Sequence, residues 1–166
     1  MNSYQYRNKS PLEYGKLSCD TLMRKFNAKD LPPKGHFHYH QGVFLSGVDH
    51  IYRLCGETIY MNYVRDWVNS LVNDAGRLAG FDHDELDDVQ PGILLFSLYE
   101  ETKSARYRKP LTELMETVKN FPVNAEGGFW HKVKNKEQMW LDGLYMAGPF
   151  TALYGRTFED KNCFES

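Results

Sequence analysis

The stretch that decides the fold is residues 87–102, DDVQPGILLFSLYEET, because residues 142–157, DGLYMAGPFTALYGRT, repeat its outline. In both copies an aspartate lies eleven residues before a Leu-Tyr pair, and a fainter copy places His40 eleven residues before Ile51. Repeated apolar segments, each opened by a polar side chain, indicate helices stacked side by side with their starts at one end of the fold. Two carboxylates gathered at that end, Asp87 and Asp142, are candidates for acid–base chemistry.

Apolar residues recur at helical spacing along most of the chain. Ser10 can cap the first helix and Pro11 suits its first turn. The strict alternation typical of a half-buried strand is not found, so the sequence predicts an all-α protein. The expected helices cover residues 10–28, 42–55, 58–75, 91–102, 105–120 and 140–158.

The repeat itself consists of helix pairs. Ile51 corresponds to Leu98 at an offset of 47 residues, and the third copy is shifted by 55 because its connector is longer. Repeated hairpins form an open solenoid or an α/α toroid. We expect residues 1–166 to form one domain, with about three hairpins of an incomplete six-hairpin ring. The chain would then be a fragment or a truncated reading frame, or copies would self-associate through exposed inner helices.

Composition narrows the class of protein. The 166 residues are 42% hydrophobic and 14% aromatic, with a net charge of −2, which favours a globular fold and predicts no attraction to nucleic acid or anionic lipid. No stretch approaches the roughly 18 apolar residues of a membrane span, and the start does not resemble a signal peptide. The three cysteines are too scattered for a disulfide framework or a zinc motif. We therefore expect a cytoplasmic protein without cofactor or metal.

Residues 126–132, EGGFWHK, precede the second aspartate of the repeat. The paired glycines allow a sharp turn or a close approach to a ligand, and the His-Lys pair supplies hydrogen-bond donors. Trp140 and Tyr145 flank Asp142 and predict a ring-lined, water-poor pocket around it. Helix capping is the alternative role for Asp142, since aspartate is a preferred N-cap residue.

Two other polar segments leave alternatives open. The acidic run at residues 82–88, DHDELDD, could be a solvated loop or a weak calcium site, and Asp88 is an alternative to Asp87. The run HFHYH at residues 36–40 would place three imidazoles on one side of an extended segment. Such a segment could bind zinc, although hydrogen bonds to a sugar are favoured. Phosphate-loop, nucleophile-elbow and HExxH motifs are not found.

The segments HFHYHQGVF, DELDDVQPGILLFSLYEET and EGGFWHKVKNKEQMWLDGLYMAGPF resemble the unsaturated rhamnogalacturonyl hydrolases, glycoside hydrolase family 105. The match corresponds roughly to the N-terminal half of a six-hairpin α/α toroid. The resemblance implies removal of the unsaturated galacturonyl residue from rhamnogalacturonan-derived oligosaccharides by hydration of the C4–C5 double bond. An aspartate protonates C4, water adds at C5, and the resulting hemiketal opens to release a rhamnosyl product.

The motif match implies that Asp142 is the acid and Asp87 a supporting carboxylate. The substrate would be an unsaturated galacturonyl-rhamnose oligosaccharide. Two alternatives stay open: an unsaturated glucuronyl hydrolase, and a non-catalytic helical-repeat module that binds carbohydrate. The substrate contacts implied by the resemblance are His38, Tyr39, Gly42, His83, His131, Lys132, Val133, Lys134 and Asn135.

Overall fold

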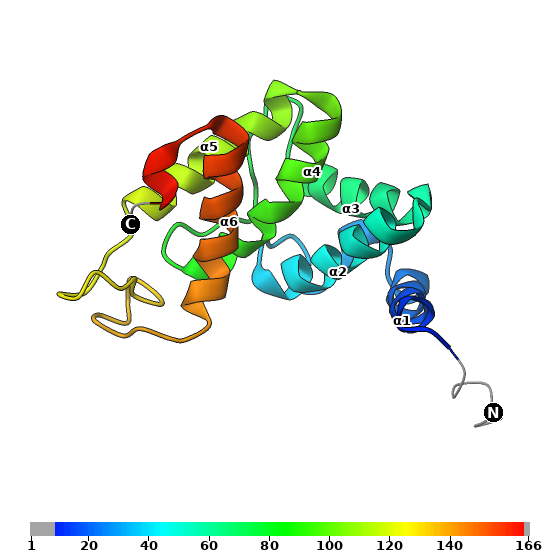
Figure 1. Ribbon diagram of the computed structural model, residues 1–166, viewed down its shortest axis with the longest axis horizontal. Helices are drawn as coiled ribbons and strands as arrows, with labels where there is room; N and C mark the ends of the chain where they lie inside the picture. Colours follow the sequence, from blue (N-terminus) through cyan, green and yellow to red (C-terminus); the bar gives the residue numbers. More distant parts are fainter. Residues whose placement is uncertain (1–8, 165–166) are drawn as a thin grey trace.

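The computed structural model describes residues 9–164, and every regular secondary-structure element among them is a helix (Figure 1). The α-helices are α1 (Pro11–Lys25), α2 (Tyr39–Cys55), α3 (Thr58–Leu71), α4 (Ile93–Thr102), α5 (Ala105–Lys119) and α6 (Gly143–Phe158). Short 3-10 turns join them: η2 (Ala28–Asp30), η3 (Leu86–Asp88), η4 (Gln90–Gly92) and η5 (Lys161–Phe164). The predicted all-α class is confirmed.

Local sequence explains where most helices begin and end. The Ser10 side chain accepts from the backbone N–H of Glu13 and the Glu13 carboxylate accepts from that of Ser10, which completes the predicted cap as a capping box. The third helix was expected to reach residue 75 but ends at Leu71. There Val72 becomes extended and pairs with Leu78, while Gly76 adopts a φ of 78° that closes the intervening turn.

Consecutive helices pack as the repeat predicts. The helices α2, α4 and α6 contact one another in that order, and α3 and α5 lie against them on the outer side. The surfaces that these helices share form the core. There Phe96 of α4 packs against Phe150 of α6, with ring centroids 5.4 Å apart. Within residues 9–164 the protein thus contains three successive helix pairs of an α/α toroid, α1–α2, α3–α4 and α5–α6.

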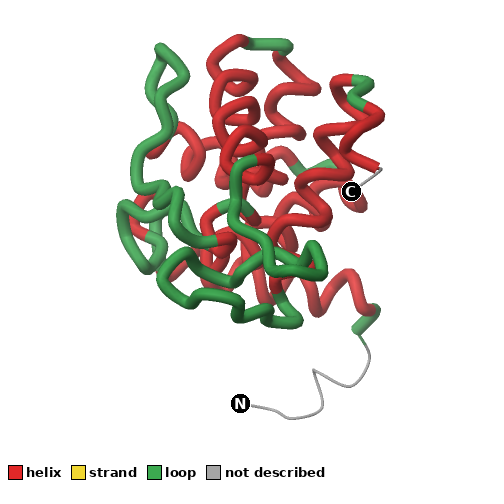
Figure 2. Tube along the Cα trace, turned by 90° about the vertical axis from the view of Figure 1, so that its left-hand side faces the viewer, coloured by secondary structure: helices red, strands yellow, loops and turns green. Residues whose placement is uncertain are grey.

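Several of the longer loops lie toward the lower side of the helical body in Figure 2, while another rises beside the helices at the upper left. They include the acidic segment before α4 and the connector between α5 and α6, which is tied to it by the isolated bridge between Glu85 and Lys132. The starts of α2, α4 and α6 therefore approach one another where these loops meet. That end of the fold carries the candidate site.

Apolar side chains are exposed on α2 and at the start of α6, the first and the last of the three helices α2, α4 and α6. On the α6 edge Leu141 and Leu144 are 86% and 72% exposed, and on α2 the side chains of Val43 and Leu54 are also exposed. Large apolar side chains exposed together are typical of surfaces that contact other protein. Across residues 9–164, none of the helices has both the length and the apolar character needed to cross a membrane.

Candidate active site

The second half of the acidic segment before α4 folds inward, whereas Asp82, His83 and Asp84 stay exposed. Leu86 and Val89 are fully buried and anchor η3, and this draws the side chains of Asp87 and Asp88 into the protein. The Asp88 carboxylate accepts from the backbone N–H of Asp82 at 2.7 Å. Burial raises the pKa of Asp88 to about 7, despite that hydrogen bond, and nearby carboxylates reinforce the shift.

The connector between α5 and α6 brings donors to this segment. Gly127 has a φ of 85°, which gives the sharp turn expected of the paired glycines. Farther along, the Val133 N–H donates to the Asp84 carbonyl at 2.8 Å, and the His131 N–H donates to the Gln138 carbonyl at 2.8 Å. These backbone bonds fix the segment that carries His131 and Lys132 beside η3.

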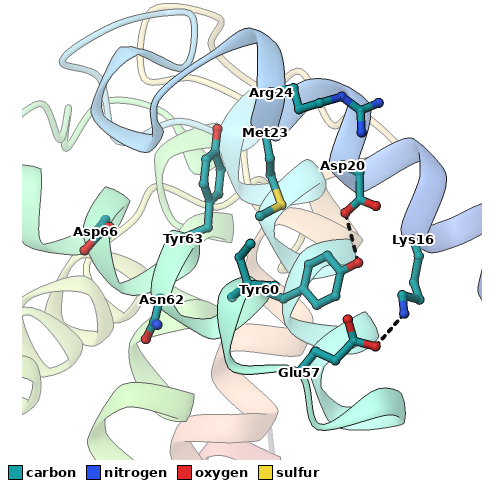
Figure 3. Close-up of a pocket in the computed structure, with 10 residues that line it drawn as sticks. Lys16, Asp20, Met23, Arg24, Glu57, Tyr60, Asn62, Tyr63 and Asp66 are labelled. Carbon is teal, nitrogen blue, oxygen red and sulfur yellow. Dashed lines mark hydrogen bonds and ion pairs between the residues drawn. The ribbon is translucent and has the colours of Figure 1, made fainter.

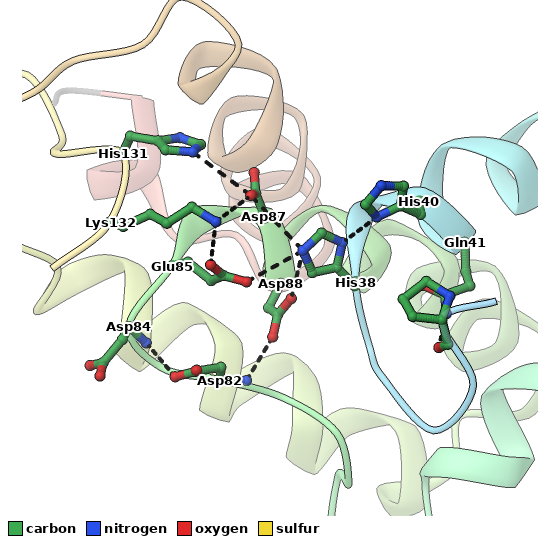
Figure 4. Close-up of polar contacts among 11 residues, drawn as sticks. His38, His40, Gln41, Asp82, Asp84, Glu85, Asp87, Asp88, His131 and Lys132 are labelled. Atoms are coloured by element: carbon green, nitrogen blue, oxygen red, sulfur yellow. Dashed lines mark hydrogen bonds and ion pairs between the residues drawn. The ribbon is translucent and has the colours of Figure 1, made fainter. Parts of the chain in front are cut away.

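Lys132 lies between two carboxylates (Figure 4). Its ammonium forms an ion pair with Glu85 and lies 3.1 Å from Asp87 Oδ2. Burial opposes the charged form of Lys132, but the hydrogen bonds to Glu85 and Asp87 outweigh it and raise the Lys132 pKa. A permanent positive charge therefore lies within an otherwise acidic cluster.

The structure brings the two repeat aspartates together. One ligand atom each from Asp87, His131 and Asp142 lie within 4.8 Å of one another. The His131 ring is stacked on Trp140, with centroids 4.0 Å apart and planes 3° from parallel. Asp142 occupies the N-cap position of α6, yet within residues 9–164 its side chain makes no capping hydrogen bond. Its carboxylate is thus directed to the cluster and not used for capping.

The expected water-poor pocket around Asp142 is not formed by the described residues. Asp142 is exposed, and Trp140 and Tyr145 are 49% and 47% exposed. Trp140 uses one face to stack on His131, so its ring shields the imidazole more than the carboxylate. The prediction failed because flanking aromatics in sequence do not enclose a side chain unless other elements cover them.

The start of α2 supplies a third wall. His38 Nε2 lies 3.3 Å from Glu85, 3.8 Å from Asp88 and 3.9 Å from Asp87. Burial lowers the pKa of His38, and the Asp87 and Glu85 charges offset this only in part. His40 Nδ1 lies 2.9 Å from His38 Nδ1, and the Tyr39 ring is stacked on His40 and tilted against His38. The expected row of three imidazoles does not form, because α2 begins at Tyr39 and His36 lies exposed outside it.

Several residues implied by the resemblance lie apart from this cluster. His83 and Val133 line a separate hollow of about 600 Å³ beside α5, where His83 Nδ1 lies 3.0 Å from the Thr117 hydroxyl. Gly42 is buried in α2, and a Cβ there would lie 1.9 Å from Gln90 Oε1, so this position serves helix packing. Lys134 is exposed, and the Asn135 N–H closes a turn onto the Lys132 carbonyl.

Another hollow, of about 570 Å³, lies between α1 and α3 on the outer side (Figure 3). The Tyr60 hydroxyl donates to Asp20 at 2.9 Å, and Lys16 forms an ion pair with Glu57. Its polar groups therefore already pair across the two helices, and none of the predicted site residues lines it. We assign it a role in joining α1 to α3.

The residue that sequence reasoning missed is Glu85. It contacts both His38 and Lys132, although each of them lies 47 residues from Glu85 along the chain, one before it and one after it. The acidic run contains Glu85, but nothing in the run distinguishes it from its neighbours. The structure also separates Asp87, which faces His131 and Lys132, from Asp88, which faces Asp82 and His38.

Comparison with known proteins gives the class of this fold and site. A solved family 105 glycoside hydrolase from C. acetobutylicum superposes with a TM-score of 0.82 and 30% sequence identity, over 92% of this chain and 42% of that one. A structure from Salmonella enterica, described as a possible family 105 member, has a TM-score of 0.75 at 19% identity, over 96% and 46% of the two chains. The latter supports the α/α toroid fold alone.

Residues 14–166 match the model of Glycosyl Hydrolase Family 88, and the chain belongs to that family. It is also 30% identical, over 130 residues, to the unsaturated rhamnogalacturonyl hydrolase YesR of Bacillus subtilis. That match covers 75% of this chain and 36% of YesR, so the chain spans well under half of these relatives. The resemblance to this group of glycoside hydrolases seen in the sequence is confirmed.

Proposed function

We propose that this chain provides the proton-donating part of an unsaturated rhamnogalacturonyl hydrolase. The observation that carries the proposal is the convergence of Asp87, His131 and Asp142 within 4.8 Å, with Lys132 3.1 Å from Asp87. The similarity to YesR, at 30% identity, supports the choice of an unsaturated galacturonyl sugar. The substrate would be an unsaturated galacturonyl-rhamnose oligosaccharide.

Each residue of the cluster has a part in the proposed reaction. Asp142 donates a proton to C4 of the enol ether, water adds at C5, and the proton that this water releases returns to the Asp142 carboxylate. Asp87, which is held by Lys132, orients the sugar. The donors on His38, His131 and Lys132 bind sugar oxygens, and the exposed face of Trp140 provides a surface on which a sugar ring can stack. The exposed position of Asp142 leaves room for the sugar beside it.

The test is turnover of the unsaturated disaccharide by the 166-residue chain and its Asp142→Asn variant. Consumption is followed by loss of the ultraviolet absorbance of the conjugated enol carboxylate. We expect turnover to fall at least about a hundredfold in Asp142→Asn, the usual scale for loss of a general acid. Asp74→Asn, which changes a fully exposed carboxylate elsewhere, is the matched control. Equal rates in Asp142→Asn and the parent chain would remove Asp142 from the acid role.

A second candidate function follows from the open site. Because the chain spans 36% of YesR and Asp142 is exposed, the cluster can bind sugar without enclosing it for reaction. Calorimetry with the same disaccharide distinguishes the two functions: binding without turnover favours a carbohydrate-binding module. An unsaturated glucuronyl disaccharide, assayed in parallel, tests the remaining choice of sugar.

A further inference from the structure

The cluster has a feature that sugar binding does not require. Asp87, His131 and Asp142 present two carboxylate oxygens and one imidazole nitrogen within 4.8 Å of one another. His38 and Glu85 form a second set of this kind with Asp87. Three protein ligands converging on one point, with the fourth direction open, are typical of an open zinc site. The arrangement at Asp142 is open, because that residue is exposed.

Each of the two buried side chains of the first set, His131 and Asp87, has one polar atom without a partner among the described residues. His131 is 2% exposed, and its Nδ1 makes no hydrogen bond within the described part of the chain. Its Nε2 lies 3.8 Å from Asp87 Oδ2 (Figure 4), which is beyond hydrogen-bond distance. The stack on Trp140 fixes the ring. Asp87 is 4% exposed, and its Oδ1 is likewise unpaired among residues 9–164. Buried polar atoms without partners call for a bound ion, water or ligand.

The charge balance favours a cation. Three carboxylates, of Glu85, Asp87 and Asp142, and the single ammonium of Lys132 belong to this cluster. That ammonium is engaged by Glu85 and by Asp87 Oδ2, and this leaves Asp87 Oδ1 without a partner. Lys132 therefore neutralises the His38 side of the cluster and leaves the Asp142 side acidic. The first set of three ligands is the better cation site for this reason.

The geometry points to a binding site for Zn²⁺, or a similar borderline divalent cation, formed by Asp87, His131 and Asp142. One imidazole and two carboxylates suit zinc in a four-coordinate site with an open position. Mg²⁺ is disfavoured, because it prefers six oxygen ligands and keeps most of its water. The inference rests on these three side chains alone, so it holds whether or not the proposed reaction does. If Asp142 is the acid, bound zinc occupies its carboxylate and blocks the sugar.

The test is calorimetric titration of ZnCl2 into the 166-residue chain, with MgCl2 titrated in parallel. We expect one zinc ion per chain, and no comparable binding of magnesium. His131→Gln and Asp142→Asn should each weaken zinc binding at least tenfold. Circular dichroism shows whether His131→Gln folds. If this variant does not fold, Asp142→Asn, which changes an exposed side chain, tests the zinc site by itself.

Three control variants locate the site. His36→Gln changes an exposed histidine outside the cluster, and His83→Gln changes the histidine that lines the hollow beside α5. Cys55→Ser removes a partly exposed thiol. Each should leave zinc binding unchanged. No zinc binding to the parent chain, equal binding by Asp142→Asn, or a tenfold loss in any of the controls would overturn the assignment.

Discussion

The two repeat aspartates lie in contrasting surroundings. We call Glu85–Asp88 the η3 wall and residues 140–145 the α6 mouth. In the η3 wall Asp87 is 4% exposed and is enclosed by the start of α2, the connector and α6. In the α6 mouth Asp142 is exposed and its nearest aromatic, Trp140, covers His131 instead. A shared register places both residues at one end of the fold, but the neighbours that arrive from elsewhere decide which is buried.

The largest effect that sharpens this comparison is on stability. Leu95 of α4, behind the η3 wall, is fully buried, whereas Leu144 in the α6 mouth is 72% exposed. We expect Leu95→Ala to lower the free energy of unfolding by about 2–5 kcal/mol, through lost burial and a cavity. Leu144→Ala should change it by less than about 0.5 kcal/mol. Urea denaturation measures both, and equal losses would mean that the mouth is covered in solution.

Removing the cation of the η3 wall should have the next largest effect. Lys132→Met leaves Glu85 and Asp87 adjacent without their shared ammonium. We expect a loss of roughly 1–3 kcal/mol in the free energy of unfolding at neutral pH, since one partner of a mostly buried ion pair is removed. Lys134→Met, at an exposed position, is the control. If the two variants are equally stable, the ion pairs of Lys132 do not hold the connector to the wall.

The pH dependence of stability tests the burial of Asp88. Its folded-state pKa is about 7, against an ordinary 3.8, so the folded protein keeps a proton that the unfolded chain releases between these values. The contribution of Asp88 to stability is therefore greatest at low pH and falls as pH rises toward 7. Asp88→Asn should remove this slope and raise the melting temperature at pH 8 by at least about 2–4 °C.

Thermal melts between pH 4.5 and 8, roughly the interval over which the proton is lost, measure this effect. Asp84→Asn, an exposed neighbour in the same run, is the control and should keep the slope of the parent chain. A parallel pH profile for Asp88→Asn and the parent would show that Asp88 is accessible to water.

The smallest effect concerns association and not stability. We expect copies of the chain to associate through the apolar edge at the α6 mouth, where Leu141 and Leu144 are exposed. Leu144→Glu should shift sedimentation toward the monomer, because a charge placed in an apolar contact opposes its burial. Lys136→Glu, at another exposed position, should not. A parent chain that is monomeric at all concentrations would contradict the predicted self-association.

Much of the fold could be predicted from local sequence. Apolar spacing located six helices, and errors arose only at ends such as Leu71, where a turn closed by Gly76 replaced the last helical residues. The eleven-residue register also indicated that Asp87 and Asp142 share one end of the fold. Both features depend on residues close together in the chain, whose geometry is fixed by helix periodicity.

Only the tertiary structure decided what surrounds those aspartates. Glu85 meets Lys132 across 47 residues of chain, burial leaves His131 Nδ1 without a partner among the described residues, and His83 lines a different hollow. The same acidic run could equally have been a solvated loop. Burial and long-range ion pairs depend on which distant segments come into contact when the helices pack. A local sequence pattern does not specify those contacts. The sequence by itself therefore determined the helices and their register, and packing determined the site.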